Sequence, residues 1–356
     1  MVKMQALLSA VWLVGLLLAL SGRTLGAPVE SARHNQHAPQ TMFVFGDSFV
    51  DSGNIPRLGR GAEMSRQWYY PYGVSYEKDD GSGVQANATG RFSDYMVQSD
   101  FIAKMLGLPL SPPTYQSTKG DYCDASGMSF AFGGTGVNGM STWMNLRQQV
   151  NAFKRMVKSG KISKNHVTHS VALLAVSGND YKRFGIRRST RDIADFAGNM
   201  TTEIAANVQR LQNLGVKRVL VNNLHPLGCT PSLCRTGDYK VCDDTSNKAA
   251  SVHNSKLKQK LGKKKGVLIV DLNTAFHNII DSESYKQFKH ERNPCCETID
   301  PKGFCGQRDQ NSKALYSQCS DPRNYFFWDD AHPTHAGWEA VMTQLQDPIK
   351  EFLGLA

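Results

Sequence analysis

The sequence predicts an α/β fold built on a mainly parallel β-sheet with helices on both faces. Four short runs are almost continuously apolar, as strands buried on both faces are: residues 41–45, 170–177, 217–224 and 266–272. Helical patterns lie between successive runs, and strands that alternate with helices form right-handed crossovers and parallel sheets. With 356 residues, 40% of them hydrophobic, the chain is long enough to bury a large core.

The first 26 residues have the pattern of a secretory signal peptide. Lys3 stands near the start, residues 6–20 are apolar, and small residues follow at Gly26 and Ala27. An uncleaved signal anchor is the alternative interpretation, because the apolar stretch is long for a signal. After cleavage we expect no stable membrane span, since no later segment is apolar for long enough.

Residues 27–40 are polar and contain prolines, which predicts a loose leader before the first strand at Thr41. Residues 56–90 form a long irregular segment containing RQWYYPYG, which we expect to cover or flank a ligand site. The sequence has no internal repeat and no recognisable linker, so we predict a single domain over residues 41–356.

Three segments carry helical patterns. Ser189 and Thr190 precede a long amphipathic run over residues 192–214, which Gly215 closes. Residues 247–261 form a second candidate. The third is an approximate apolar stripe formed by Met144, Leu146, Val150, Phe153 and Val157.

The cysteine content fits an oxidising compartment, where an even count suggests disulfides. Spacing does not define their connectivity, and a zinc site is a poor alternative because no C-x2-C pair occurs. Asn87 and Asn199 begin N-x-S/T sequons, which also suit a secreted glycoprotein. The eight cysteines are Cys123, Cys229, Cys234, Cys242, Cys295, Cys296, Cys305 and Cys319.

The chain is basic. Its formal charge of +10 falls to +8 when residues 1–26 are removed, because that segment contains Lys3 and Arg23 and no acid. Such a charge favours an acidic matrix or a polysaccharide surface, or simply forms a solvated basic face. The chain has the pattern of a secreted protein and no recognisable nucleic-acid-binding motif, so we expect no nucleic acid as a partner. Nothing in the sequence indicates an oligomeric state.

Ser48 is the first candidate for chemistry. The first apolar run stops at Gly46-Asp47-Ser48, and the second stops at Ser177-Gly-Asn179-Asp. Ligands of parallel sheets bind beyond the carboxyl ends of the strands, so both turns are expected at one site. A serine nucleophile also needs a base, a group that orients the base, and donors for the oxyanion.

Near the C-terminus, Asp329 precedes His332 by three residues in a turn that contains proline. This spacing lets the carboxylate reach one imidazole nitrogen while the other faces a serine. Oxyanion donors are available in the N–H of Ser48, in the glycine loop at residues 133–136, and in the side-chain amide of Asn179.

Five blocks in this order resemble plant GDSL-type esterase/lipases of the SGNH hydrolase superfamily: FGDSFVDSGN, TGRFSD, SFAFGGTGV, SGND and FFWDDAHPT. The resemblance spans nearly the whole mature chain. It implies a three-layer α/β/α, flavodoxin-like SGNH hydrolase fold. It further implies Ser48 as nucleophile, His332 as base, Asp329 as its orienting group, and Gly134 and Asn179 as oxyanion donors with the Ser48 amide.

Other motifs are weaker. The G-x-S-x-G motif of ordinary α/β-hydrolases is absent. Residues 134–139 match G-x-G-x-x-G, but a dinucleotide site needs an acidic residue about 20 positions further on, and residues 125–179 contain none. His332 and His335 are spaced H-x2-H without further ligands, so we expect no metal. We therefore expect no cofactor.

The resemblance implies carboxylic esters as substrates, from acyl lipids to O-acetyl groups on cell-wall polysaccharides. We favour deacetylation of a polysaccharide such as xylan, because Trp68, Tyr69, Tyr70 and Tyr72 could stack on sugar rings; local packing beneath the loop is their alternative role. A lipase is the second hypothesis, and a non-catalytic carbohydrate-binding or defence protein on the same fold is the third. We expect an extracellular or cell-wall location, with the Golgi lumen as the alternative.

Overall fold

A computed structural model describes residues 39–57, 62–75, 88–137, 142–184, 189–281 and 286–355. The predicted signal peptide, most of the predicted leader and Asn87 lie outside these ranges. Residues 37–356 form one compact unit. In the described ranges, no helix is both long and apolar enough to cross a bilayer.

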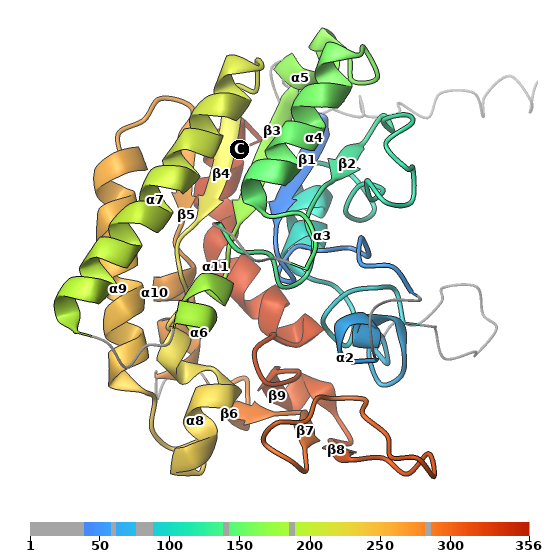
Figure 1. Ribbon diagram of the computed structural model, residues 1–356, viewed down its shortest axis with the longest axis vertical. Helices are drawn as coiled ribbons and strands as arrows, with labels where there is room; N and C mark the ends of the chain where they lie inside the picture. The colour runs from blue at the N-terminus through green and yellow to red at the C-terminus, as the bar shows by residue number, and fades with distance from the viewer. Residues whose placement is uncertain are drawn as a thin grey trace, which may run out of the picture. The chain divides into compact units, whose positions relative to one another are not determined.

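The central sheet has five parallel strands in the order β2-β1-β3-β4-β5, which is the flavodoxin-like order (Figure 1). This confirms the predicted α/β fold with a parallel sheet. The three-residue edge strand β2 was not predicted, because it is too short to form a recognisable apolar run. The strands are β1 (Thr41–Gly46), β2 (Gly127–Ser129), β3 (Ser170–Ala175), β4 (Arg218–Asn222) and β5 (Val267–Val270).

The central strands are apolar at most positions because both of their faces are buried. In β1, Met42 and Val44 pack into the core on one side of the sheet, while Phe43 and Phe45 pack into the core on the other side. Successive side chains of a strand point to opposite faces, so a helix-covered strand needs apolar residues at both parities. The continuous apolar run in the sequence follows from this geometry.

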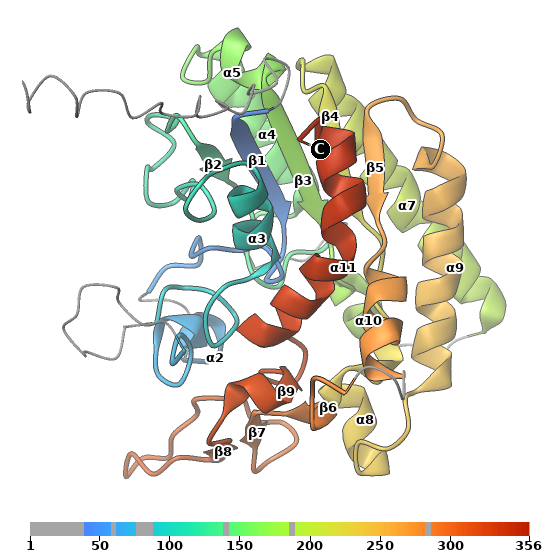
Figure 2. The same cartoon turned by 180° about the vertical axis from the view of Figure 1, so that it is seen from behind.

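Helices cover both faces of the sheet and form the outer layers of an α/β/α arrangement. One face carries α4, α7 and α9 (Figure 1), and the other carries α3, α10 and α11 (Figure 2). The bounds are α3 (Gln98–Met105), α4 (Leu146–Lys158), α7 (Thr190–Asn213), α9 (Asp244–Leu261), α10 (Leu272–Ile280) and α11 (His335–Leu353). The structure thus confirms the three predicted helices, α4, α7 and α9, and adds three that the sequence patterns did not identify.

Shorter elements gather beyond the carboxyl ends of the strands. The short helices are α2 (Ala62–Ser65), α5 (Lys164–Thr168), α6 (Asn179–Phe184) and α8 (Pro231–Cys234), with 3-10 turns at residues 66–68, 227–229, 235–237 and 322–324. Of these helices, α5 lies at the opposite end of the sheet (Figure 1). The short strands β6 (His290–Pro294) and β9 (Tyr325–Phe327) pair in parallel, and β7 (Cys296–Thr298) pairs antiparallel with β8 (Tyr316–Gln318).

Six of the eight cysteines form disulfides in this region. The pairs are Cys229–Cys242, Cys295–Cys319 and Cys296–Cys305. The two remaining cysteines are free thiols: Cys123 is half-buried, and Cys234 is buried in α8. The predicted disulfides are therefore present for three pairs, and the even count did not mean that every cysteine is paired.

Candidate active site

Ser48 lies in the turn directly after β1. Gly46 is the last residue of the strand. It must be glycine, because a Cβ on that residue would lie 1.8 Å from the carbonyl oxygen of Ala175 in β3. Gly46 also has a φ of +136°, a conformation that L side chains rarely adopt. The chain therefore turns sharply away from β3 at Gly46 and delivers Ser48 to the carboxyl edge of the sheet. The Ser48 side chain keeps a small exposure, 8% for the residue.

His332 faces this serine. Its Nε2 lies 2.7 Å from Ser48 Oγ, and its Nδ1 lies 2.7 Å and 2.9 Å from the two carboxylate oxygens of Asp329. An ionised carboxylate only accepts hydrogen bonds, so Nδ1 carries the proton. Nε2 is then the acceptor for the Ser48 hydroxyl. The structure thus brings together three residues that the sequence separates by up to 284 positions.

The turn that carries Asp329 and His332 is held by its own backbone. Asp329 Oδ1 accepts the N–H groups of Ala331 and His332, at 3.0 Å and 2.9 Å. The N–H of Trp328 donates to the carbonyl oxygen of His332 at 2.7 Å. These bonds close the loop between β9 and α11 and fix the carboxylate next to the imidazole.

Tyr72 and Arg66 extend this network, and the sequence analysis did not identify that role. The buried hydroxyl of Tyr72 donates to Asp329 Oδ2 at 2.7 Å, and Arg66 Nε donates to the same hydroxyl at 2.8 Å. The guanidinium of Arg66 also lies 3.8 Å from the carboxylate of Asp329. The residues come from a loop 257 positions away from Asp329, so no local pattern links them.

The pKa of Asp329 reflects these neighbours. Burial by itself would raise the pKa of this carboxyl. His332, the charge of Arg66 and the hydrogen bond from Tyr72 outweigh that effect and hold the pKa well below its usual range. Asp329 is therefore ionised at neutral pH.

Aromatic rings fix the orientation of the imidazole. Phe92 stacks on His332 with ring centroids 5.0 Å apart, and Phe49 approaches it edge-on at 6.0 Å. The guanidinium of Arg66 lies over the Phe92 ring, 5.1 Å from its centroid. The His332 ring is therefore held by both hydrogen bonds and packing.

Two backbone N–H groups of residues that line the cavity are available as oxyanion donors. Among the described residues, the N–H groups of Ser48 and Gly134 have no hydrogen-bond acceptor. The neighbouring N–H of Gly133 is different, because it donates to Asp51 Oδ2 at 2.8 Å. Gly134 and Ser48 both line the same cavity. This geometry favours Gly134 over Gly133 for the role that the resemblance implies.

Asn179 lines the same cavity, but its amide is already engaged. Its Nδ2 donates to Asp47 Oδ2 at 3.1 Å and to the carbonyl oxygen of Thr135 at 3.0 Å. An amide nitrogen carries two protons, so both are committed to protein acceptors. Asn179 can bind an oxyanion only by exchanging one of these bonds or by sharing a proton between two acceptors.

Asp47 positions this side of the site, a role that the sequence analysis did not assign. Its carboxylate accepts the N–H and hydroxyl of Ser177 as well as the Asn179 amide and the N–H of Phe49. Burial raises the pKa of Asp47 to about 6, against the lowering effect of these hydrogen bonds. In the sequence, the position of Asp47 between Gly46 and the nucleophile candidate Ser48 could have indicated this role.

The four aromatic residues of the loop differ in burial, and the sugar-stacking role suggested for them stays a prediction. Tyr72 is buried against Asp329, and none of the four lines the cavity that contains Ser48. Trp68 is half-buried, and its indole N–H donates to the carbonyl oxygen of Ile55 at 2.6 Å. Tyr69 and Tyr70 are exposed, at 44% and 55%. Packing beneath the loop is therefore the better account of Tyr72 and Trp68.

The cavity has a volume of about 670 Å³. One part of its wall is apolar and is formed by Ile55, Met64, Phe92 and Phe304. Another part carries hydroxyl groups and is formed by Thr230, Ser232, Thr236 and Thr245. As predicted, the segment 56–90 contributes to the wall, through α2 and the turn that follows it.

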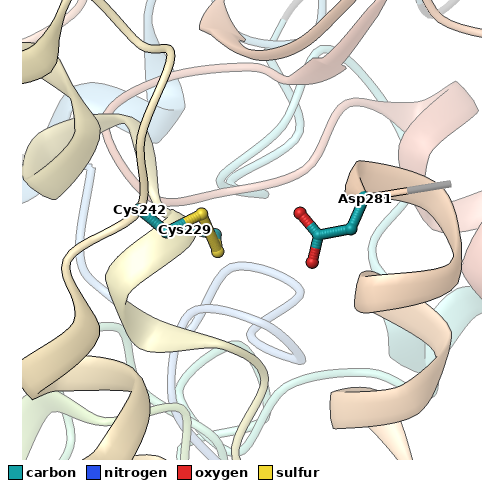
Figure 3. Close-up of side chains that lie close together, drawn as sticks. All are labelled: Cys229, Cys242 and Asp281. Carbon is teal, nitrogen blue, oxygen red and sulfur yellow. A yellow bond between two sulfur atoms is a disulfide. The ribbon is translucent and has the colours of Figure 1, made fainter. Parts of the chain in front are cut away.

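Among the described residues, two groups of side chains lie as close together as metal ligands do, but their atoms are already bonded to each other or to protein partners. Figure 3 shows Asp281 pointing toward Cys229 and Cys242, whose sulfur atoms are bonded to each other and so are not thiolate ligands. The Asp281 carboxylate is also engaged by Arg292 at 2.7 Å and by His277. In the second group, Asp329 and His332 already bond to each other beside Asp330.

The described sequon at Asn199 lies on α7, where the asparagine side chain is exposed. The other predicted sequon, at Asn87, lies outside the described residues. Glycosylation of both asparagines stays a prediction.

A serine, an imidazole oriented by a buried carboxylate, and two unengaged backbone N–H groups at one cavity wall form the apparatus of acyl transfer. Three comparisons with known proteins bear on this arrangement. A family model described as GDSL-like lipase/acylhydrolase matches residues 42–345. Two GDSL esterase/lipases of Arabidopsis thaliana are 32% and 30% identical to this chain; the alignments cover 90% and 94% of this chain, and 91% and 96% of those proteins.

Among solved structures, a catalytic mutant of an acetylxylan esterase from Geobacillus stearothermophilus aligns with a TM-score of 0.40 and 12% identity. The alignment covers 89% of this chain and 94% of that one. A likeness at this level bears on neither substrate nor mechanism.

Proposed function

Since this chain belongs to the GDSL-like lipase/acylhydrolase family and is a serine ester hydrolase, we propose that Ser48, His332 and Asp329 carry out its reaction. The reaction needs no cofactor. Its substrate is a carboxylic ester, which enters the cavity beside Ser48.

Attack begins with proton transfer. His332 Nε2 takes the proton of the Ser48 hydroxyl as Oγ bonds to the ester carbonyl carbon. The imidazolium that forms keeps its Nδ1–H bond to Asp329, whose ionised carboxylate stabilises the positive charge. The same Nε2–H then protonates the leaving alcohol. Water attacks the acyl-serine with His332 as base, which releases the acid and restores Ser48.

The carbonyl oxygen becomes an oxyanion during each attack. The N–H groups of Ser48 and Gly134 are unengaged donors for this charge. Asn179 supplies a third donor when its amide shifts from Thr135 or Asp47 toward the oxyanion.

The observation that carries the proposal is the 2.7 Å separation of Ser48 Oγ from His332 Nε2, with Asp329 on the far nitrogen. The test measures free acid released from acetylated xylan, acetylated pectin and a long-chain triglyceride by wild type and Ser48→Ala. We expect wild type to hydrolyse an ester and Ser48→Ala to lose the activity. Equal activity of the two proteins would contradict the role of Ser48.

The natural substrate that we propose is an O-acetyl ester on a cell-wall polysaccharide such as xylan. The loop aromatics no longer support this choice, because none of them lines the cavity. The support is now the hydroxyl-bearing part of the wall, from Thr230 to Thr245, which suits a polar alcohol. Acetate release from one polymer identifies it as the substrate.

A lipase acting on acyl lipids is the second candidate. The apolar wall at Ile55, Met64, Phe92 and Phe304 favours it. Activity that rises with acyl length and at an oil–water interface would support the lipase over the deacetylase.

A non-catalytic carbohydrate-binding or defence protein is a candidate from another class. It predicts that Ser48→Ala leaves the function unchanged. The close alignment of Ser48, His332 and Asp329 supports turnover, because binding alone needs no oriented base.

We also propose that residues 1–26 are a signal peptide, that residues 27–40 are a leader, and that residues 41–356 form one domain of a secreted protein. The three disulfides support an oxidising compartment. The N-terminal sequence of the protein purified from a plant secretion medium tests the cleavage site.

A further inference from the structure

A second histidine lies at the cavity and takes no part in the proposed reaction. His225 follows β4 at the carboxyl edge of the sheet and lines the same cavity as Ser48. It is 2% exposed, and among the described residues neither of its ring nitrogens has a hydrogen-bond partner. Buried polar groups almost always have partners, so a polar side chain without one at a cavity wall points to a ligand.

The ring of His225 is held in place by aromatic packing alone. Its centroid lies 5.0 Å from that of Phe49 and 5.1 Å from that of Phe276 in α10. Its orientation is thus fixed while its polar atoms are unpaired. Burial lowers the pKa of His225 to about 3, so the ring is neutral and offers one N–H donor and one nitrogen acceptor.

His225 lies near the ring that would protonate the leaving alcohol. The alcohol oxygen receives its proton from His332 Nε2, so the alcohol part of the ester lies beside that ring. Phe49 contacts both His332 and His225, and it belongs to the core on the α3, α10 and α11 face of the sheet. Both histidine rings therefore pack around Phe49 and line the same cavity.

The chain that follows His225 also lines the cavity, with the apolar side chains of Leu227 and Leu233 and with hydroxyl side chains. Thr230, Ser232 and Thr236 line the cavity, and the disulfide Cys229–Cys242 closes this segment into a loop. A neutral donor–acceptor group in a cavity that also offers hydroxyl side chains can pair with a hydroxyl group of the alcohol.

Resting on the proposed esterase function, we infer that His225 is a specificity-determining residue that hydrogen-bonds a hydroxyl group of the leaving alcohol. The substrate class is an ester whose alcohol carries a second hydroxyl close to the ester oxygen. Such an ester gains a hydrogen bond in the cavity, while its apolar analogue leaves the imidazole unpaired.

Two esters test this directly: ethylene glycol monoacetate and propyl acetate, which differ by a hydroxyl in place of a methyl group. For each protein variant, kcat/KM is measured for both esters on one preparation, so the ratio does not depend on the folded fraction. We expect wild type to prefer the hydroxylated ester and His225→Phe to lower this ratio about tenfold, or about 1.4 kcal/mol. His225→Gln, which keeps a donor and an acceptor, should retain more of the preference than His225→Phe.

His253 provides a matched control. It is also a buried histidine, but it bonds to Tyr181 at 3.0 Å and does not line the cavity, so His253→Gln should leave the ratio at the wild-type value. An unchanged ratio in His225→Phe, or equal losses on both esters, would overturn the inference while leaving the esterase intact. Absence of hydrolysis of every ester by wild type would instead remove the proposed function itself.

Discussion

On one side of Ser48 the His332 ring is bonded to Asp329, packed on Phe92, and supported by Tyr72 and Arg66 behind the carboxylate. On the other side, the oxyanion donors consist of two unengaged N–H groups and the amide of Asn179, which is bonded to Asp47 and Thr135. The base side is complete before substrate binds, whereas on the proposed oxyanion side the Asn179 amide must exchange a hydrogen bond or share a proton. Proton transfer is thus preorganised, and part of the oxyanion stabilisation carries a cost.

The largest effect is expected on the base side. Asp329→Asn should lower kcat about 10⁴-fold, because the amide N–H₂ donates to Nδ1 and forces the imidazole into the wrong tautomer for accepting the Ser48 proton. Steady-state kinetics on an activated acetate ester measure the loss, and circular dichroism checks the fold. A decrease below tenfold would mean that the orientation of His332 does not depend on Asp329.

A smaller effect is expected on the oxyanion side. Asn179→Ala should lower kcat about 10²- to 10³-fold, as removal of a single oxyanion donor does. Because the wild-type amide must first leave Asp47 or Thr135, we expect a loss toward the lower end of that range. Kinetics under the conditions used for Asp329→Asn give the comparison. A loss larger than that of Asp329→Asn would reverse the contrast between the two sides.

Tyr72→Phe tests the support behind Asp329. Loss of the hydroxyl removes the 2.7 Å bond to Asp329 and leaves Arg66 Nε without its acceptor, so kcat should fall about tenfold with little change in KM. Tyr70→Phe is the control, because Tyr70 is 55% exposed and does not line the cavity. Equal kinetics of the two variants would show that Tyr72 only packs beneath the loop.

The effect expected at Asp47 is on stability and not on rate. The pKa of Asp47 is about 6 in the folded state and has the ordinary value of 3.8 in the unfolded state. Folding is therefore favoured by protonation of this carboxyl, and the resulting stabilisation is lost as the pH rises through 6. The variant Asp47→Asn has no carboxyl at this position, so it does not lose stability in this way. The free energy of unfolding of the variant, relative to wild type, should therefore rise between pH 4 and pH 7, by up to about 3 kcal/mol. Urea unfolding at the two pH values measures it, and a flat or falling difference would contradict the shift.

The sequence predicted the parallel sheet and the positions of the Ser48, His332 and Asp329 candidates, because buried strands and short motifs are local patterns. It could not identify the roles of Tyr72, Arg66 or His225. Tyr72 reaches Asp329 across 257 positions, and His225 meets Phe276 only through the crossover after β4. Such contacts depend on how the helices pack on the sheet, which periodicity does not encode.

The aromatic cluster of the loop shows the same limit. The aromatic run from Trp68 to Tyr72 appears uniform in sequence. In the structure Trp68 is half-buried, Tyr69 and Tyr70 are exposed, and Tyr72 is buried. Composition suggested a sugar-binding surface, and tertiary packing gave Tyr72 a place behind the base instead.

The separation of 284 residues between Ser48 and His332 has a consequence for biosynthesis. A ribosome adds about 5–20 residues per second, so roughly 15 to 60 s pass between synthesis of the nucleophile and synthesis of its base. During that time β1 can pair with β3 and bury its apolar residues while Ser48 stays unactivated. The nascent chain therefore carries Ser48 without the imidazole that would activate it until the segment that contains His332 has been made.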